Sequence, residues 1–463
     1  MHLPEQLIQS LQDVKGFHET AFIEVHQSEV QITSIRINPA KWTATDRIYN
    51  QELKEGQRIP WTSLGYYLPQ RPSFTFDPLF HAGCYYVQEA SSMFLELALQ
   101  QTVDLSQPYN VLDLCGAPGG KSTHLQSLIS PQSLLVTNEV IKSRVLILEQ
   151  NIIKWGASNV MVTNNDPQHF SRLGSFFDVM VVDAPCSGSG LFRRDPEAIN
   201  EWSLNNVALC SQRQQRILSD ALPALKEGGI LIYSTCSYSK EEDEEIGDWL
   251  MREQGMEPLS LTIEDSWGIV ETTSQEGAKG YRFFPDKVKG EGFFMACFRK
   301  TTTGEEVKQR PKKLVTASKN DRAVLQKWVR LEDQDIYVER DQLIAIPQIL
   351  SDNYASIKGQ LNVYYAGVTL GQVMRDKLVP SHALALSSLL SEDILVLELP
   401  YEQAVKYLQR GELNLQPQRT GWQVVTYQNH PLGWINALPN RVNNYYPKEM
   451  RILKQNNDFS FEK

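Results

Sequence analysis

Apolar runs alternate with amphipathic segments between about residues 108 and 300. Continuous apolar runs predict strands at 110–115, 134–140, 159–166, 177–185 and 228–236, and segments with helical spacing, such as 121–129 and 141–156, lie between them. Apolar strands that alternate with helices are typical of a parallel sheet covered on both faces. The pattern therefore predicts an α/β, Rossmann-like fold, with a late strand at 292–300 on the far edge of the sheet.

The flanking regions have different patterns. Helical and short extended segments precede the sheet, while short strands with turn signals follow residue 330, and 420–436 predicts a β-hairpin. We expect five parts: an N-terminal α+β extension (1–107), the α/β domain (108–300), a basic linker (301–330), a first C-terminal domain (331–395) and a β-rich C-terminal domain (396–463).

Length and composition limit the class of protein. The 463 residues suffice for roughly two to four domains, and no apolar run reaches the roughly 18 residues of a membrane span. The N-terminus has no signal-peptide core, so we expect a cytoplasmic protein without disulfides. The six cysteines form no C-x-x-C pair, which argues against a structural zinc site.

The distribution of charge changes what the net charge implies. A net charge of −10 argues against a nucleic-acid partner, but residues 1–300 carry 25 basic against 37 acidic residues, whereas 301–463 carry 20 against 18. Within 307–330 there are eight basic residues and one acidic residue. This strip is either a solvated linker followed by a helix or a surface for a phosphate backbone.

A glycine-rich loop follows the first strand of the predicted sheet. The segment VLDLCGAPGGKSTHL (111–125) places three glycines and a proline before the next helix. Glycines let the backbone approach a ligand, and the helix N-terminus supplies unpaired N–H groups. A phosphate-binding P-loop is excluded by spacing, because Cys115 stands where its first glycine is required.

Two acidic residues at strand ends favour a nucleoside ligand. Glu139 ends the second strand, where a carboxylate can bind both ribose hydroxyls, and Asp166 ends the third, near the expected adenine. A single such acid is more often a helix cap, but the combination with the glycine-rich loop favours a ligand. Because no G-x-G-x-x-G motif is present, S-adenosylmethionine fits better than a nicotinamide cofactor.

Two cysteines follow strands at the same edge. Cys236 ends the fifth strand, and Cys186 follows a proline in DAPCSGSG. A buried thiol is usually packing, but a helix N-terminus lowers a thiol pKa, and two thiols facing a methyl donor favour chemistry. The acids after Cys236 are interpreted as a helix N-terminal turn, in which Ser239 and Glu242 form a capping box.

Methylation of a pyrimidine carbon requires a thiolate beside this cofactor. Carbon 5 of cytosine is a poor nucleophile, and thiolate addition at carbon 6 converts the ring to an enamine that accepts the methyl group. Loss of the carbon-5 proton and elimination of the thiol follow. Asp183 can pair with the cytosine edge and favour the addition.

The motifs LDLCGAPGGKS, NEV, VVDAPCSGSG, YSTCS and KGEGFF occur in this order, after RINP (36–39) and GCYYVQEASSM (83–93). Together they resemble the RNA (cytosine-5)-methyltransferases of the Nol/Nop/Sun group, over about residues 20–300. The resemblance implies that Cys236 is the nucleophile and that Cys186 helps to release the product, whereas related DNA enzymes attack with the Pro-Cys residue. One departure is Asp286, where many relatives carry a histidine. The resemblance therefore does not define that part of the substrate wall.

The candidate residues fall into two sets. The candidate catalytic residues are Cys236, Cys186, Asp183 and Lys121. The candidate cofactor-binding residues are Cys115, Gly116, Ala117, Pro118, Gly119, Gly120, Lys121, Glu139, Arg144, Asp166 and Asp183, for S-adenosyl-L-methionine and without a metal.

The C-terminal third resembles the PUA-like RNA-binding tail of the RsmF-type members of this family, through LGWINALPNRVNNYYPKEMRI (432–452). A generic small β-domain is the alternative. The first hundred residues leave no room for an RsmB-like helical domain. The resemblance implies a monomeric enzyme that makes 5-methylcytosine in 16S ribosomal RNA of the small subunit, with RNA contacts also in the N-terminal extension. A transfer-RNA methyltransferase and a non-catalytic RNA-binding assembly factor remain alternatives.

Overall fold

The computed structural model describes residues 2–28, 30–42, 57–304, 307–308, 310–413 and 419–454. Parts of the predicted N-terminal extension, basic linker and last domain therefore lie outside the described residues. Within the described ranges, no helix is long and apolar enough to cross a membrane.

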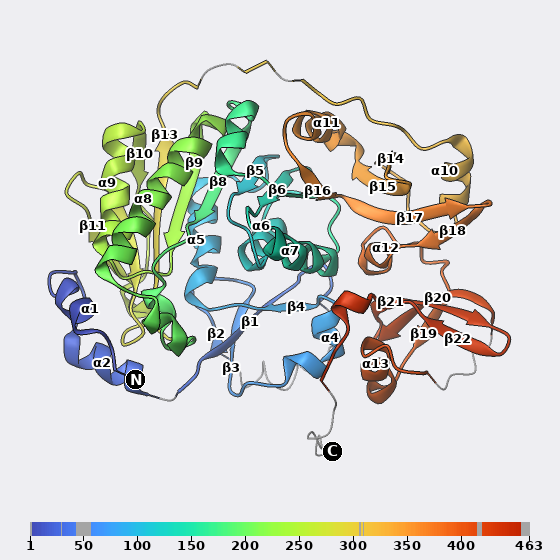
Figure 1. Cartoon of the computed structure of the whole chain (residues 1–463), viewed down its shortest axis with the longest axis horizontal. Coiled ribbons are helices and arrows are strands. Elements are labelled where there is room, and N and C mark those ends of the chain that lie inside the picture. The colour runs from blue at the N-terminus through green and yellow to red at the C-terminus, as the bar shows by residue number, and fades with distance from the viewer. Residues whose placement is uncertain are drawn as a thin grey trace.

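A ten-stranded sheet forms the centre of the molecule (Figure 1). Its order is β11-β12-β13-β9-β8-β5-β6-β7-β16, with β10 paired to β13. The parallel strands are β5 (Asn110–Asp113), β6 (Leu134–Asn138), β7 (Val160–Thr163), β8 (Phe177–Asp183) and β9 (Leu225–Thr235). The predicted parallel sheet is confirmed. Because β6 and β8 flank β5 on opposite sides, a topological switch point lies between β5 and β8, where open α/β sheets bind ligands.

An antiparallel group extends the sheet beyond β9. It contains β10 (Met256–Leu259), β11 (Val270–Thr273), β12 (Lys279–Phe283) and β13 (Phe293–Lys300). β13 lies between β9 and β12, so the expectation that this late strand forms the far edge is wrong. The edge is β11, whose short sequence carries no comparable apolar run.

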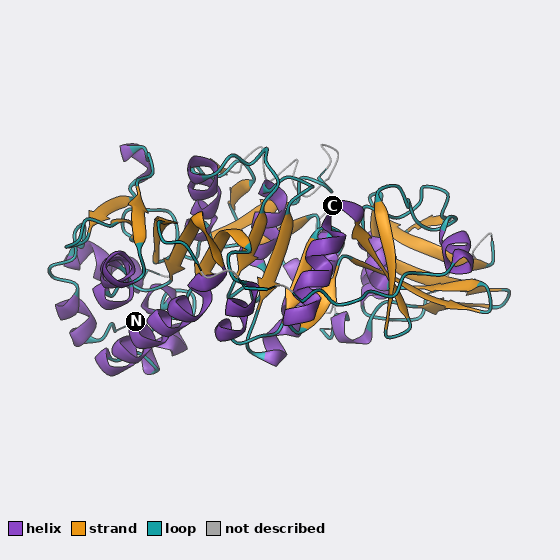
Figure 2. Cartoon of the chain, turned by 90° about the horizontal axis from the view of Figure 1, so that it is seen from above, coloured by secondary structure: helices purple, strands orange, loops and turns teal. Residues whose placement is uncertain are grey.

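Helices cover both faces of the sheet (Figure 2). On one face, α5 (Leu95–Thr102), α6 (Gly120–Leu128) and α7 (Lys142–Trp155) share a core with Val111; on the other, α8 (Leu204–Ala221) and α9 (Glu244–Glu253) share a core with Leu112. Successive strand residues thus face opposite cores, which is why these strands are apolar throughout.

The N-terminal region packs beside the sheet. It contains α1 (Glu5–Ser10), α2 (Glu19–Gln27), β1 (Thr33–Ile37), β2 (Gln57–Arg58), β3 (Gly65–Leu68), α4 (Pro78–His81) and β4 (Tyr85–Val87), with the sheet order β2-β3-β1-β4. Phe22 of α2 packs edge-on against Tyr238, with ring centroids 5.1 Å apart. This contact places the N-terminal helices next to the carboxyl end of β9.

Two modules follow the main sheet. The first contains α10 (Lys319–Leu325), β14 (Gln334–Glu339), β15 (Gln342–Pro347), α11 (Ser351–Gln360), β16 (Val363–Ala366), β17 (Val368–Met374), β18 (Lys377–Pro380) and α12 (His382–Leu386). The second contains β19 (Val396–Glu398), α13 (Tyr401–Leu408), β20 (Gly421–Tyr427), β21 (His430–Leu438) and β22 (Arg441–Asn444). The antiparallel β20–β21 pair confirms the predicted hairpin.

The first module is joined to the central sheet. Its strand β16 pairs antiparallel with β7, and Tyr354 and Ile357 of α11 lie in the core that holds Leu112. The second module packs on the N-terminal sheet, where Leu408 and Ile35 share one core. Both modules are therefore held by apolar contacts as well as by the connecting chain.

Candidate active site

Two thiols meet at the carboxyl ends of β8 and β9. These strands are parallel neighbours, with Asp183 opposite Ser234, so the loops that follow them leave the sheet side by side. Gly190 N donates to Cys236 O at 2.8 Å and fixes one loop on the other. The Sγ atoms of Cys186 and Cys236 lie 2.9 Å apart. Contact with Cys236, reinforced by burial, raises the pKa of the Cys186 thiol well above its usual range. Cys186 therefore stays protonated and can donate to Cys236.

A lysine–carboxylate pair lies next to the thiols. Lys121 Nζ is 2.8 Å from Asp183 Oδ2, and Ser234 Oγ donates to Asp183 Oδ1 at 2.8 Å. Burial lowers the pKa of Lys121, but the charges of Asp183 and, less strongly, Cys236 outweigh burial and raise this pKa. A permanent ammonium group is thus within electrostatic reach of Cys236.

Glu242 joins the two cysteine loops. Its carboxylate accepts hydrogen bonds from Ser187 N at 2.8 Å, Ser187 Oγ at 2.5 Å and Ser237 Oγ at 2.6 Å, and these serines follow the two cysteines directly. Gln214 Nε2 of α8 donates a fourth bond at 3.1 Å. The side chain is fully buried, and burial raises its pKa. We call Cys186, Cys236, Ser187, Ser237 and Glu242 the thiol site.

The capping-box prediction at this position is wrong. Ser239 makes no side-chain cap bond, and Glu242 points into the thiol site. The neighbouring acids are also engaged, because Asp243 and Glu244 both form ion pairs with the buried Arg282. Sequence spacing alone could not show that a cation and two serines would meet this acidic run.

The glycine loop (Cys115–Lys121) connects β5 to α6. The Ala117–Pro118 peptide is cis, and Gly119 has φ +117°, a conformation that favours glycine. At Gly116 an added Cβ would lie 2.0 Å from Thr137 Oγ1, so only glycine fits. Gly116 N donates to Asn138 O at 2.7 Å, which ties the loop to the end of β6.

Side chains on the neighbouring strand and helix hold the loop from outside. Arg144 Nη2 donates to Ala117 O at 2.7 Å, and its Nη1 lies 3.4 Å from Glu139 Oε2. Glu139 is only 4% exposed, and its other oxygen accepts from Ile141 N at 2.9 Å. The structure therefore brings Glu139 and Arg144 to the glycine loop, and their cofactor roles stay predictions.

Asp113 lies beneath the loop and was not among the predicted site residues. Its Oδ2 accepts from Ser122 Oγ at 2.6 Å, whereas Oδ1 is buried without a hydrogen-bond partner among the described residues. Burial raises its pKa to about 7. The signal that could have identified it is its position at the last residue of β5, three residues before Gly116.

Two of the predicted cofactor-binding residues, Asp166 and Cys115, make contacts within the protein. Asp166 caps the turn after β7, with Oδ1 accepting from Gln168 N at 3.2 Å, and it lies 3.6 Å from Arg216. Cys115 packs against the core of the α8 face, and burial raises its pKa. The cofactor roles of both residues stay predictions.

The residue that departs from the family pattern lies near the N-terminal helices. Asp286 Oδ2 is 3.3 Å from Lys287 Nζ, and its Oδ1 is buried without a partner among the described residues. The negative charge of Asp286 favours higher pKa values for Tyr238 and His26. Within the described residues, Asp286 makes no contact with the thiol site. Among the described residues no group of His, Cys, Asp and Glu could hold a metal ion.

Comparisons with known proteins identify three segments. The family model described as 16S rRNA methyltransferase RsmB/F matches residues 100–299, the N-terminal domain of 16S rRNA methyltransferase RsmF matches 3–90, and the methyltransferase RsmF PUA domain matches 394–452. The three segments follow the order of the N-terminal region, the central sheet and the last module.

Solved structures share the fold. A methyltransferase homolog protein from Pyrococcus horikoshii is 29% identical, with a TM-score of 0.51 over 64% of this chain and 100% of that chain. A structure of NSun6 from the same organism with SFG has a TM-score of 0.54 at 21% identity, over 65% of this chain and 98% of that chain.

Curated relatives match along nearly the whole chain. "Ribosomal RNA small subunit methyltransferase F" of Shewanella oneidensis is 30% identical over 439 residues, and that of Shewanella woodyi is 31% identical over 440 residues. In each case the match covers 90% of both chains. This chain therefore belongs to the RsmB/F family of 16S rRNA methyltransferases, and its N-terminal and PUA domains are those of the RsmF type.

Proposed function

We propose that this protein methylates carbon 5 of a cytidine in 16S ribosomal RNA, with S-adenosyl-L-methionine as methyl donor and Cys236 as nucleophile. The observation that carries the proposal is the contact of two free thiols, 2.9 Å apart, beside the Lys121–Asp183 pair. Membership of the RsmB/F family and the names of the curated relatives support the substrate.

The residues around the glycine loop fit S-adenosylmethionine. An added Cβ would collide with Thr137 at Gly116 and would lie within 3.2–3.3 Å of neighbouring side chains at Gly119 and Gly120, so the glycines allow the close fit of this loop. Glu139 would hold the ribose hydroxyls, and the unpartnered Asp113 Oδ1 offers an acceptor beneath the loop. The bound cofactor would supply an electrophilic methyl group at the edge where Cys236 lies.

The protein residues prepare the cytosine. The Cys236 thiolate adds to carbon 6, and the electron pair of the 5,6 double bond moves through the ring, which makes carbon 5 nucleophilic. The Lys121 ammonium balances the negative charge that this addition creates, and Asp183, held by Lys121, pairs with the cytosine edge.

Cys186 acts after carbon 5 has gained its methyl group. The carbon-5 proton must leave as an electron pair restores the double bond and the carbon-6–sulfur bond breaks. We assign this release step to Cys186, whose sulfur contacts the attacking sulfur. Before it can accept the carbon-5 proton, Cys186 must release its own proton to solvent, and the raised pKa of its thiol makes the resulting thiolate a strong base.

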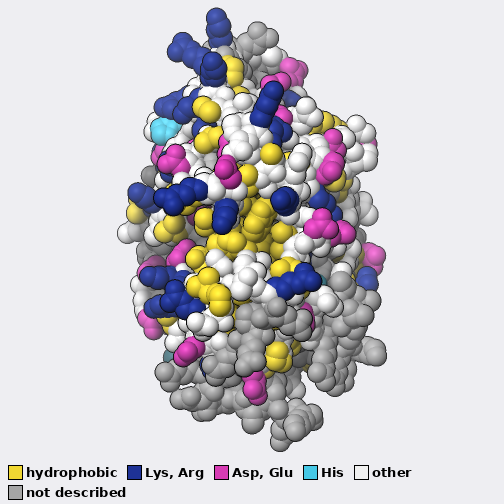
Figure 3. All heavy atoms as spheres, turned by 90° about the vertical axis from the view of Figure 1, so that its right-hand side faces the viewer, with side chains coloured by type: hydrophobic (Ala, Val, Ile, Leu, Met, Phe, Trp, Pro, Cys, Tyr) yellow, Lys and Arg dark blue, Asp and Glu magenta, His cyan; other side chains and the backbone are white. Residues whose placement is uncertain are grey.

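The C-terminal modules offer a surface for RNA. Figure 3 shows Lys and Arg side chains around an apolar area on the face that these modules form. The β17–β18 hairpin supplies exposed Met374 and Val379 next to exposed Arg375 and Lys377. Basic groups beside apolar side chains suit a nucleic acid, because the first bind phosphates and the second contact bases. Action on an assembled small subunit, a monomeric state and a cytoplasmic location stay predictions.

The test uses purified protein, radiolabelled methyl donor, and three RNAs: 16S rRNA, small subunits and transfer RNA. We expect label in 16S rRNA or in the subunit, at cytidines that bisulfite sequencing locates. Label in transfer RNA alone would favour the transfer-RNA enzyme. RNA binding without label in any substrate would favour the assembly factor. Calorimetry with S-adenosylhomocysteine checks the cofactor separately, because Glu139→Ala should weaken this binding.

A further inference from the structure

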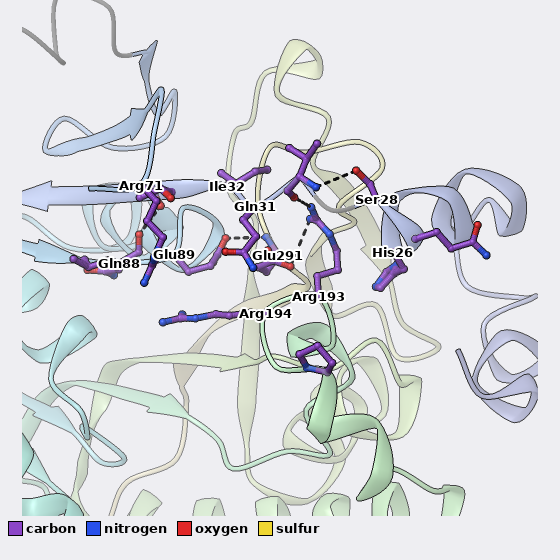
Figure 4. A pocket seen from close by; sticks show the side chains of 16 residues that line it. His26, Ser28, Gln31, Ile32, Arg71, Gln88, Glu89, Arg193, Arg194 and Glu291 are labelled. Carbon is purple, nitrogen blue, oxygen red and sulfur yellow. Dashed lines mark hydrogen bonds and ion pairs between the residues drawn. The ribbon is translucent and has the colours of Figure 1, made fainter. Parts of the chain in front are cut away.

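A cavity of about 460 Å³ opens between the N-terminal region and the loops of the active site (Figure 4). It is lined by residues at the end of α2, the start of β1, the end of β4, the 193–196 loop, Arg71 and Glu291. Its volume lies within the range of about 300–1,000 Å³ that is usual for small-ligand sites. The space is therefore sufficient for one nucleotide unit.

Most charged groups on the cavity wall already have hydrogen-bond or ion-pair partners within the protein. Arg193 donates to Gly290 O at 3.1 Å and Val30 O at 2.9 Å, and it lies 3.5 Å from Glu291 Oε2. Both oxygens of Glu89 accept backbone N–H groups at 2.9 Å. Arg193 and Glu291 therefore offset each other, whereas Glu89 keeps its negative charge among backbone N–H groups.

Two arginines keep their charges available. Arg71 and Arg194 are exposed, and neither forms an ion pair within the described parts of the chain. Arg71 lies over the Phe74 ring, with 5.5 Å from its guanidinium carbon to the ring centroid. In Figure 4 the side chain of Arg194 runs past Glu291 toward the side of Arg71 and Gln88. The cavity thus presents two unpaired guanidinium groups.

Backbone hydrogen bonds connect the wall of the cavity to the thiol site. Gly292 N, next to Glu291, donates to Gly190 O, and Gly190 N donates to Cys236 O. Arg194 follows Gly190 by four residues in the same loop. On the other side, an added Cβ at Gly120 would lie 3.8 Å from Gln88, a residue of the cavity wall. The wall of the cavity is therefore in contact with both the loop of the thiol site and the glycine loop.

We infer that this cavity binds the nucleotide next to the target cytidine, with Arg194 and Arg71 holding its phosphate group. This inference rests on the proposed function. When the target base reaches Cys236, the chain connects it to a neighbour within one nucleotide length, and the cavity is the adjoining space with unpaired cations. Guanidinium groups bind phosphate oxygens in a bidentate way, and the polar wall at Gln88 and Gln31 can contact the neighbouring base.

The experiment compares Arg194→Ala, Arg71→Ala and the control Arg299→Ala. Arg299 is exposed on β13 and is not a cavity residue, so all three variants lose one surface charge. The probe is a short single-stranded RNA with one cytidine that the unmodified enzyme methylates. In two further probes a neutral methylphosphonate replaces the phosphate on one side of this cytidine or on the other. Thermal melting verifies that each variant is folded.

We expect Arg194→Ala to weaken binding of the unmodified RNA about tenfold and to lower the salt slope by about one. The KM should rise more than kcat falls, and Arg71→Ala should act in the same direction. One of the two methylphosphonates should weaken binding to the unmodified enzyme by a similar factor but should have no further effect on Arg194→Ala. Arg299→Ala should keep the full response to that substitution.

Two outcomes would overturn the inference. Arg194→Ala and Arg299→Ala could weaken binding equally, which would reduce Arg194 to a general surface charge. Alternatively, the effects of Arg194→Ala and of either neutral phosphate could add up, which would show that they do not contact each other. Absence of methylation by the unmodified enzyme on every RNA is a different result, because it contradicts the proposed function itself.

Discussion

The glycine loop and the thiol site lie at the same edge of one sheet but keep their shapes by different means. The glycine loop is one stretch of seven residues, and at Gly116 there is no space for a Cβ. The thiol site joins loops fifty residues apart through the hydrogen bonds of Glu242. A close backbone fit is therefore decisive in the first region and buried side-chain hydrogen bonds are decisive in the second, so substitutions should affect the two regions in separable ways.

The largest effect should come from the two cysteines. Cys236→Ala should abolish methyl transfer, because no bond to carbon 6 can form. Cys186→Ala should still add to the ring and methylate it but should release it slowly, so a covalent protein–RNA complex should accumulate. The complex is measured as a shifted band on a denaturing gel.

The double variant is the control for this experiment, and it should give no band. A band from Cys236→Ala but none from Cys186→Ala would exchange the two roles. Full activity in both single variants would leave the thiols a packing role only. Binding of S-adenosylhomocysteine should stay unchanged in all three proteins, because the thiols lie outside the glycine loop.

Gly116→Ala tests whether the close fit of the glycine loop determines its affinity for the cofactor. The added Cβ would lie 2.0 Å from Thr137 Oγ1, so the loop must shift at a cost of about 1–3 kcal/mol. We expect affinity for S-adenosylhomocysteine, measured by calorimetry, to fall about 10- to 100-fold. Gly120→Ala is the milder control, because its Cβ meets the Tyr86 ring at 3.3 Å. Equal losses for both variants would contradict the close fit at Gly116.

Glu242→Gln tests the thiol site by hydrogen bonding. The amide offers one acceptor oxygen fewer and adds a donor, so one of the serine or Gln214 bonds is lost. A lost buried bond costs about 1–3 kcal/mol, and we expect kcat to fall about tenfold with unchanged binding of S-adenosylhomocysteine. Glu245→Gln, at an exposed position nearby, should leave kcat unchanged. Weaker cofactor binding without a change in kcat would show that Glu242 supports the glycine loop and not the thiol site.

The smallest effect should come from a link between the first C-terminal module and the glycine loop. The Asn165 side chain bonds Asn362 at 3.0 and 3.2 Å, its carbonyl accepts from Asn138 Nδ2, and Asn138 O accepts from Gly116 N. Asn165→Ala should weaken S-adenosylhomocysteine binding by about two- to fivefold, because loss of a net hydrogen bond costs about 0.5–1.5 kcal/mol.

Asn353→Ala is the matched control for this link. Asn353 of α11 also joins the module to the sheet, through Asn110 Oδ1 at 2.8 Å, but at the opposite end of β5. This variant should lower the melting temperature without changing cofactor affinity. If both variants weaken cofactor binding equally, the cause is general destabilisation of the fold and not loss of the hydrogen bonds that run through Asn138.

The parallel sheet and the place of the site could be predicted because their signals are local. Each apolar strand, the glycines after β5 and the two cysteines are continuous in sequence, and one topology places all of them at one edge. The alignment of Cys186 with Cys236 follows from the register of β8 and β9.

The parts that escaped prediction depend on contacts between distant residues. The role of Glu242 depends on Ser187, 55 positions away, and the place of β13 depends on the pairing of β11 and β12 beyond it. The spacing of Ser239 and Glu242 suits a helix cap. Glu242 is instead buried between the two loops that contain Ser187 and Ser237, and it accepts hydrogen bonds from both. Similarly, no local pattern in 331–395 indicates that β16 belongs to the central sheet.

The pairing of β16 with β7 sets an order of events during synthesis. Thr163 and Val363 are partners across 200 positions of the chain. At about 5–20 residues per second, roughly 10–40 s pass between the synthesis of these two strands. During that interval β7 is an open edge that can pair with another chain. The nascent protein is therefore exposed to aggregation from the synthesis of β7 until its first C-terminal module arrives.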